Sequence, residues 1–178
     1  MVNNFKIYIS YFYQIRNFTP NMLPLSTAMY PPKWYRQMGI NDYWVDKNGV
    51  INGLDISEFI FPHKIFNEHL GDAKCCNECG FYPISEDHYK WCPFMKVYYN
   101  HLKSQNLIDI LNKYSNNIIR LFNHVFKKNI DTIVLIVHEP PEKYCGERPV
   151  LKKYFSDYGI ELEEWRPNEK WDEGIFAW

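Results

Sequence analysis

The sequence predicts an α/β fold, in which a single compact domain contains a mainly parallel sheet flanked by helices. Three observations support this prediction: an uninterrupted apolar run at 131–138, an amphipathic helical pattern before it at 105–129, and a helix followed by a strand after it at 149–165. The order helix, buried strand, helix, strand is typical of parallel sheets with right-handed crossovers. We therefore interpret residues 1–178 as one domain, a length that a single core can serve.

The first part of the chain has the pattern of strands and tight turns. Residues 4–12 are rich in β-forming side chains and predict a first strand, and residues 21–29 predict a second. The pair Asn48-Gly49 stands between two short β-like runs, which is a hairpin signal.

The second part contains the two clearest helices. Apolar residues of the segment 105–129 recur in steps of three and four, which predicts that they share one core-facing side: Leu107, Leu111, Tyr114, Ile118, Leu121 and Val125. The run 131–138 is apolar and β-branched, as in a strand covered on both faces. Pro149 suits the first turn of the following helix and Gly159 suits its end.

Composition and charge limit the classes of function. The net charge of −1 gives no global field that would attract nucleic acid or an anionic membrane, so a nucleotide or nucleic-acid partner requires a local site. The sequence has neither the pattern of a signal peptide nor an apolar run long enough to cross a membrane. Five cysteines, an odd number, then predict a cytoplasmic protein with reduced thiols.

Residues 75–93 contain four of these five cysteines. Cys76, Cys79, His88 and Cys92 have the spacing C-x2-C-x8-H-x3-C, which fits a closed tetrahedral zinc site. Cys75 is the alternative fourth ligand, but adjacent residues of an extended backbone point in opposite directions, so we favour His88. An iron–sulfur cluster and metal-free thiols are the remaining interpretations. We predict that a structural zinc holds residues 72–95 as an insertion in the domain.

The loop after the apolar run 131–138 contains polar residues at a position where open α/β sheets bind ligands. Glu139 is a predicted general base, Cys145 a predicted nucleophile, and Arg148 a predicted anion-binding group at the start of a helix. In the structural interpretation of the same residues, Arg148 pairs with Glu139 or Glu142, and Cys145 fills space beneath the helix.

Three separated segments stand out: the triplet Ser10-Tyr11-Phe12, the segment "LPLSTAMYPPKWY" and the segment "HEPPEKYCGERPVLKKYF". In this order they resemble the family known as domain of unknown function 488. The resemblance covers residues 5–36 and 130–165 and implies a compact α/β domain, without implying a reaction. The chain departs from the Cys-His-Arg pattern of the family, because Gly-Glu separates the cysteine from the arginine and the histidine is missing.

The resemblance also implies that its segments converge on one cleft. Tyr11 and Trp34 would then offer a stacking surface, with Ser10 beside them, opposite the predicted catalytic residues Glu139, Cys145 and Arg148. One hypothesis is an enzyme that acts on a nucleotide or nucleic acid, and it predicts a pocket with perturbed ionisation. The other is a non-catalytic, zinc-stabilised protein that recognises a ligand or a protein partner, and it predicts an exposed aromatic patch with Arg148 bridged to acidic residues.

Overall fold

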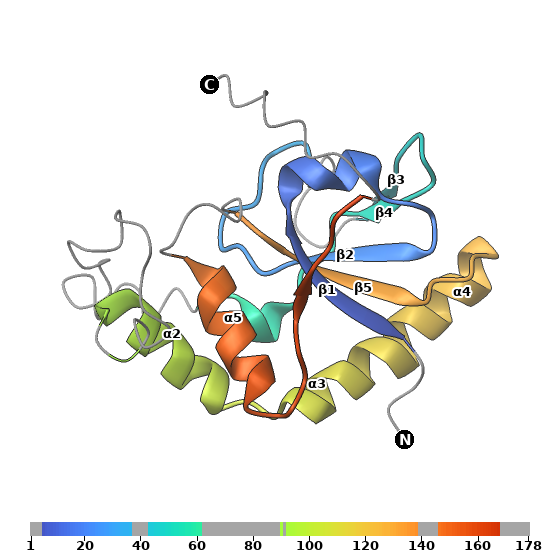
Figure 1. Cartoon of the computed structure of the whole chain (residues 1–178). Coiled ribbons are helices and arrows are strands. Elements are labelled where there is room, and N and C mark those ends of the chain that lie inside the picture. Colours follow the sequence, from blue (N-terminus) through green and yellow to red (C-terminus); the bar gives the residue numbers. More distant parts are fainter. Residues whose placement is uncertain (1–4, 37–42, 62–89, 91, 139–145, 168–178) are drawn as a thin grey trace.

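A four-stranded parallel sheet forms the centre of the computed structural model (Figure 1), which describes residues 5–36, 43–61, 90, 92–138 and 146–167. The strands lie in the order β2-β5-β1-β6, and all neighbouring strands pair in parallel. The α/β class is confirmed, and each strand lies within or beside a segment predicted from the sequence: β1 (Lys6–Tyr11), β2 (Met22–Ser26), β5 (Thr132–Val137) and β6 (Glu163–Glu164).

Strand β5 is the most enclosed part of the sheet. All of its residues are buried, and it pairs with β1 from Lys6↔Thr132 to Tyr11↔Val137 and with β2 on its other side. A strand with a helix or another covering element on both faces has no solvent-facing side, which explains its continuous apolar sequence.

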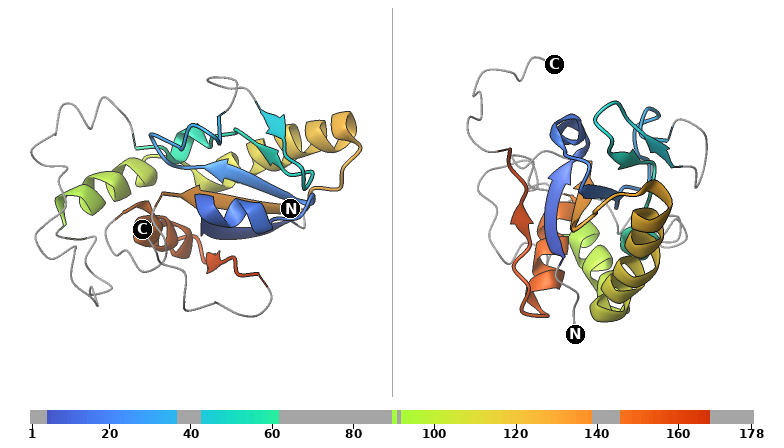
Figure 2. Two further views of the ribbon diagram at one scale, coloured as in Figure 1. Left: turned by 90° about the horizontal axis from the view of Figure 1, so that it is seen from above. Right: turned by 90° about the vertical axis from the view of Figure 1, so that its right-hand side faces the viewer.

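The helices cover one face of the sheet, and other elements cover the opposite face (Figures 1 and 2). The opposite face is covered by the 3₁₀ helix η1 (Phe12–Asn17), by Ala28 and Tyr35, and by Val50. The α-helices of the described residues pack on the first face: α2 (Pro93–Lys103), α3 (Leu107–Lys113), α4 (Arg120–Phe126) and α5 (Glu147–Ser156).

At the edge of the sheet where the strands end, the connections that follow β1 and β5 lead to opposite faces. The chain leaves β1 toward η1 on one face, whereas it leaves β5 toward α5 on the other face. Neighbouring parallel strands whose connections diverge in this way leave a crevice outside their carboxyl ends, and open α/β sheets bind ligands there.

The hairpin predicted at Asn48-Gly49 is present. Strands β3 (Trp44–Val45) and β4 (Ile51–Asn52) pair in antiparallel fashion. The side chain of Asp46 accepts hydrogen bonds from the backbone amides of Asn48 and Val50 at 2.8 and 2.9 Å, which fixes the turn. Gly49 has a φ of +78°, in the left-handed region that glycine adopts without strain.

The helix predicted at 105–129 is divided into α3, a π-helical segment η4 (Tyr114–Ile119) and α4. A π-helical turn contains one more residue than an α-helical turn, so the residues after it are rotated relative to those before it. Phe122 is therefore buried, whereas Leu121 and Val125 are 51% and 54% exposed. The prediction that these two residues face the core is wrong for this reason.

Helix α2 is absent from the prediction based on sequence, which assigns its first residues to the insertion 72–95. The sequence nevertheless contains two signals of this helix. The buried side chains recur in steps of three and four, at Met95, Tyr98 and Leu102, and a proline, Pro93, occupies the first turn. Among the described residues, no helix is long and apolar enough to cross a membrane.

Candidate functional site

The carboxyl ends of β1, β2 and β5 lie at one edge of the sheet. Thr27 directly follows β2, and its backbone amide donates a hydrogen bond to the carbonyl oxygen of Ile136 on β5 at 2.9 Å. His138 directly follows β5 and is exposed. The three strand ends therefore bring together residues that are far apart in the sequence.

A buried carboxylate lies at this edge. Glu147 is the first residue of α5, is 8% exposed, and accepts a hydrogen bond at 3.1 Å from the hydroxyl of Thr27, which is fully buried. A carboxylate in the first turn of a helix is favourably placed relative to the helix dipole. Neither residue is among the sequence-predicted site residues, because a glutamate at the start of a helix is common and Thr27 belongs to no motif.

Aromatic side chains form a second part of the site. Phe12 is buried directly after β1, and its ring makes edge-on contacts with Trp34 and His138 at centroid distances of 6.1 and 5.9 Å. Trp34 is 45% exposed. The structure thus places Trp34, a predicted ligand-binding residue, at the strand ends. There Trp34 and His138 both contact the buried ring of Phe12.

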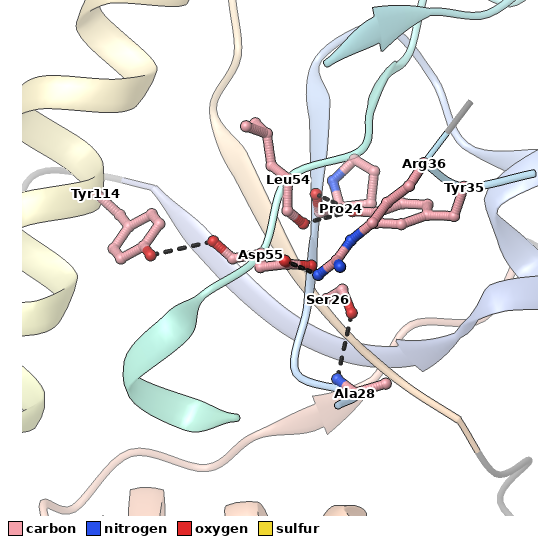
Figure 3. A network of polar contacts seen from close by, with 8 residues as sticks. All are labelled: Pro24, Ser26, Ala28, Tyr35, Arg36, Leu54, Asp55 and Tyr114. Atoms are coloured by element: carbon pink, nitrogen blue, oxygen red, sulfur yellow. Dashed lines mark hydrogen bonds and ion pairs between the residues drawn. The ribbon is translucent and has the colours of Figure 1, made fainter. Parts of the chain in front are cut away.

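Tyr35 holds the segment that carries Trp34 (Figure 3). Its ring is fully buried, and its hydroxyl lies 2.7 Å from the carbonyl oxygen of Leu54 and 3.1 Å from that of Pro24 on β2. Burial raises the pKa of Tyr35 far above its usual value, so the hydroxyl stays protonated and donates. The ring also contacts Trp34 edge-on at 6.1 Å. The ring of Trp34 is therefore exposed to solvent, while the buried and hydrogen-bonded Tyr35 holds the segment that carries it.

The next residue, Arg36, forms an ion pair with Asp55 (Figure 3). The backbone carbonyl of Asp55 accepts a hydrogen bond from the hydroxyl of Tyr114 at 3.1 Å, which links this pair to the π-helical segment. The backbone of Ser26 also joins this region, because its amide donates to Leu54. These contacts fix the backbone that follows the exposed tryptophan.

Ser10 and Tyr11, the other two predicted ligand-binding residues, lie at the end of β1. Ser10 is 1% exposed, and its hydroxyl has no hydrogen-bond partner among the residues that the structure describes. The ring of Tyr11 stacks on that of Tyr13 at 6.5 Å, and its hydroxyl accepts a hydrogen bond from Gln14 at 3.1 Å. Tyr11 is thus partly engaged by η1, and Ser10 lies within the sheet rather than at its surface.

Arg148 is buried, and its charge is compensated. It is 5% exposed, and its Nη1 donates to Oε2 of Glu164 on β6 at 2.5 Å. Lys152, one turn further along α5, lies 2.9 Å from the other oxygen of the same carboxylate. Arg148 therefore joins α5 to β6. Its other predicted neighbours are outside the described residues: Glu139, Glu142 and Cys145.

Most of the predicted zinc ligands are also outside the described residues, namely Cys75, Cys76, Cys79 and His88. Cys92 is described: it precedes the first residue of α2, is fully buried, and belongs to the main hydrophobic core. Within the described ranges, no group of three histidine, cysteine or acidic residues is arranged to hold a metal ion. The zinc site stays a prediction.

A groove of about 340 Å³ lies at the opposite end of the sheet. Lys6 and Thr132, at the amino ends of β1 and β5, line it together with Tyr8, Trp165 and Arg166. None of the predicted site residues that the structure describes lines this groove. The polar and aromatic residues at the strand ends and this groove are therefore separate features of the molecule.

Together these features define an α/β domain with an exposed, supported tryptophan and a buried glutamate at the carboxyl ends of its parallel strands. No protein-family model matches the chain, and comparisons with curated proteins and with solved structures give no match either. The resemblance to domain of unknown function 488 remains a prediction from the three segments.

Proposed function

We propose that the protein binds a nucleotide, or the end of a nucleic-acid strand, at the carboxyl ends of β1, β2 and β5. The observation that carries this proposal is the exposed ring of Trp34, which packs edge-on against the buried rings of Phe12 and Tyr35. Stacking of a base on an aromatic side chain contributes about 1–3 kcal/mol. A ring that is already held in place loses little conformational freedom when a base stacks on it.

The charge beside Trp34 suits the phosphate of such a ligand. Lys33 is exposed and forms no ion pair with a described residue, so it is available to a phosphate. Arg148, in contrast, is already neutralised by Glu164, which supports the non-catalytic interpretation over an arginine that binds the substrate.

Trp34→Ala is expected to weaken binding of AMP and of a ten-nucleotide single-stranded DNA by at least about tenfold, because it removes the stacking surface. Isothermal titration calorimetry measures the change in Kd. Tyr43→Ala is the matched control, because Tyr43 is similarly exposed, at 44%, but packs on α4. Equal affinities of Trp34→Ala and wild type, or a wild type that binds neither probe, would contradict the proposal.

Catalysis at the same strand ends is the second candidate, and the buried pair Thr27–Glu147 favours it. In this case Glu147 acts as general acid or base, together with the predicted Glu139 and Cys145. Incubation with ATP and with single-stranded DNA, followed by chromatography of the products, tests for turnover. Turnover that Glu147→Gln reduces more than 100-fold would establish the enzyme; absence of products with wild type would leave binding alone.

We propose in addition that a structural zinc, bound by Cys76, Cys79, His88 and Cys92, holds residues 72–95 against the domain. The ligand spacing supports this proposal. A cytoplasmic location agrees with reduced cysteines as zinc ligands.

A further inference from the structure

Three large apolar side chains are exposed on and beside α4, and we call them the α4 patch: Tyr43, Leu121 and Val125. Their exposed fractions are 44%, 51% and 54%. Tyr43, just before β3, contacts the rings of Phe122 and Phe126 at 5.0 and 5.6 Å, which places it against the helix. Figure 2 shows α4 and the β3–β4 hairpin on the same side of the molecule.

The patch exists because of the π-helical segment η4. In a continuous α-helix over 107–126, Leu121 and Val125 would share the buried side with Leu107 and Leu111. The extra residue in the π-helical turn rotates them into solvent and buries Phe122 instead. Leu121 and Val125 are four residues apart and so lie one above the other on the exposed side of α4.

Two basic residues flank the patch along α4. Arg120 is the first residue of the helix and Lys127 directly follows its last residue; both are exposed, and neither forms an ion pair or hydrogen bond with a described residue. The acid of the neighbouring turn, Asp46, is occupied by backbone amides of the hairpin. Lys128 contacts the carbonyl oxygen of Gly49 and ties the end of α4 to that hairpin. The described surface here is therefore apolar at its centre and cationic at its rim.

We propose that the α4 patch is a docking surface for a protein partner whose binding segment combines apolar anchors with acidic residues. Apolar side chains of the partner would cover Leu121 and Val125, and its carboxylates would pair with Arg120 and Lys127 at the rim. An apolar centre with a charged rim is the usual composition of a protein–protein interface. The charge complementarity selects acidic segments and disfavours basic ones.

The probe is a fluorescein-labelled 16-residue peptide in which leucine and glutamate recur at helical spacing, and fluorescence anisotropy with the full chain reports binding. Wild type is expected to bind it, and Leu121→Asp and Arg120→Glu are each expected to weaken binding at least tenfold. Tyr13→Asp is the matched control, because Tyr13 is 49% exposed on the opposite face of the sheet, and it should bind as wild type does.

Four results of the peptide-binding and sedimentation-velocity experiments would overturn the proposal. They are a wild type that does not bind the acidic peptide, equal binding of a peptide with lysine in place of glutamate, unchanged binding by Leu121→Asp, and a dimer in sedimentation velocity that Leu121→Asp dissociates. The last result would assign the patch to a second copy of this chain. Sedimentation with phosphatidylserine vesicles that depends on Leu121 would assign it to a membrane and equally overturn the proposal. Circular dichroism of each variant confirms that the fold is retained.

Discussion

Arg148→Met is expected to lower the free energy of unfolding by about 3–5 kcal/mol, because it leaves the carboxylate of Glu164 buried without its closest partner. The Arg148 side chain is 6% exposed and that of Glu164 is 11% exposed, so water cannot replace the lost contact easily. In a domain of this size the midpoint of thermal unfolding should fall by about 6–20 °C. Urea denaturation measures the change in free energy.

The chain offers a matched control for this experiment. Lys152 contacts the same carboxylate, but its side chain is 40% exposed, so Lys152→Met should cost at most about 1 kcal/mol. The double variant Arg148→Met, Glu164→Leu removes both buried charges and should recover most of the lost stability. A single variant Arg148→Met as stable as wild type would show that the pair does not hold α5 to β6.

Cys79→Ser is expected to release the predicted zinc and to destabilise the protein by several kcal/mol. Binding of a structural zinc contributes about 10–16 kcal/mol in isolated zinc-binding peptides, so loss of one ligand has a large effect. Plasma mass spectrometry should find about one zinc per wild-type chain and none in the variant, and thiol titration should find the ligand cysteines protected in wild type only.

Cys145→Ser is the control for this prediction, because Cys145 stands outside the proposed ligand set and its variant should retain zinc. Comparison of Cys75→Ser with His88→Ala identifies the fourth ligand, since only the true ligand's variant loses metal. A wild-type protein that contains no metal and has five titratable thiols would contradict the zinc site.

Most of the sheet could be predicted from the sequence because local patterns determine it. The apolar run of β5 and the Asn48-Gly49 turn each have one physical explanation, and both appear where they were expected. The rotation at η4 could not be predicted from periodicity, because the residues on both sides of it follow the α-helical spacing and only tertiary contacts select the extra residue. One such contact is the hydroxyl of Tyr114, which reaches the backbone of Asp55.

The candidate site was predicted less completely than the fold. Trp34 and the end of β1 lie at the strand ends, and Arg148 pairs with Glu164; Glu139 and Glu142 are outside the described residues, so their pairing with Arg148 stays a prediction. Acidic residues occur throughout the last third of the chain, and sequence alone does not tell which of them β6 places opposite α5. The Thr27–Glu147 hydrogen bond joins residues 120 positions apart, and no local pattern indicates it.

The position of β1 in the sheet constrains the order in which the protein folds during synthesis. This first strand pairs with β5 and β6, so Lys6 finds its partner only after Thr132 has left the ribosome. Until then its apolar face and its backbone groups lack their native neighbours, and pairing between residues so distant in sequence is slow. We therefore expect nascent chains that stop before residue 132 to be sensitive to proteases and to depend on chaperones.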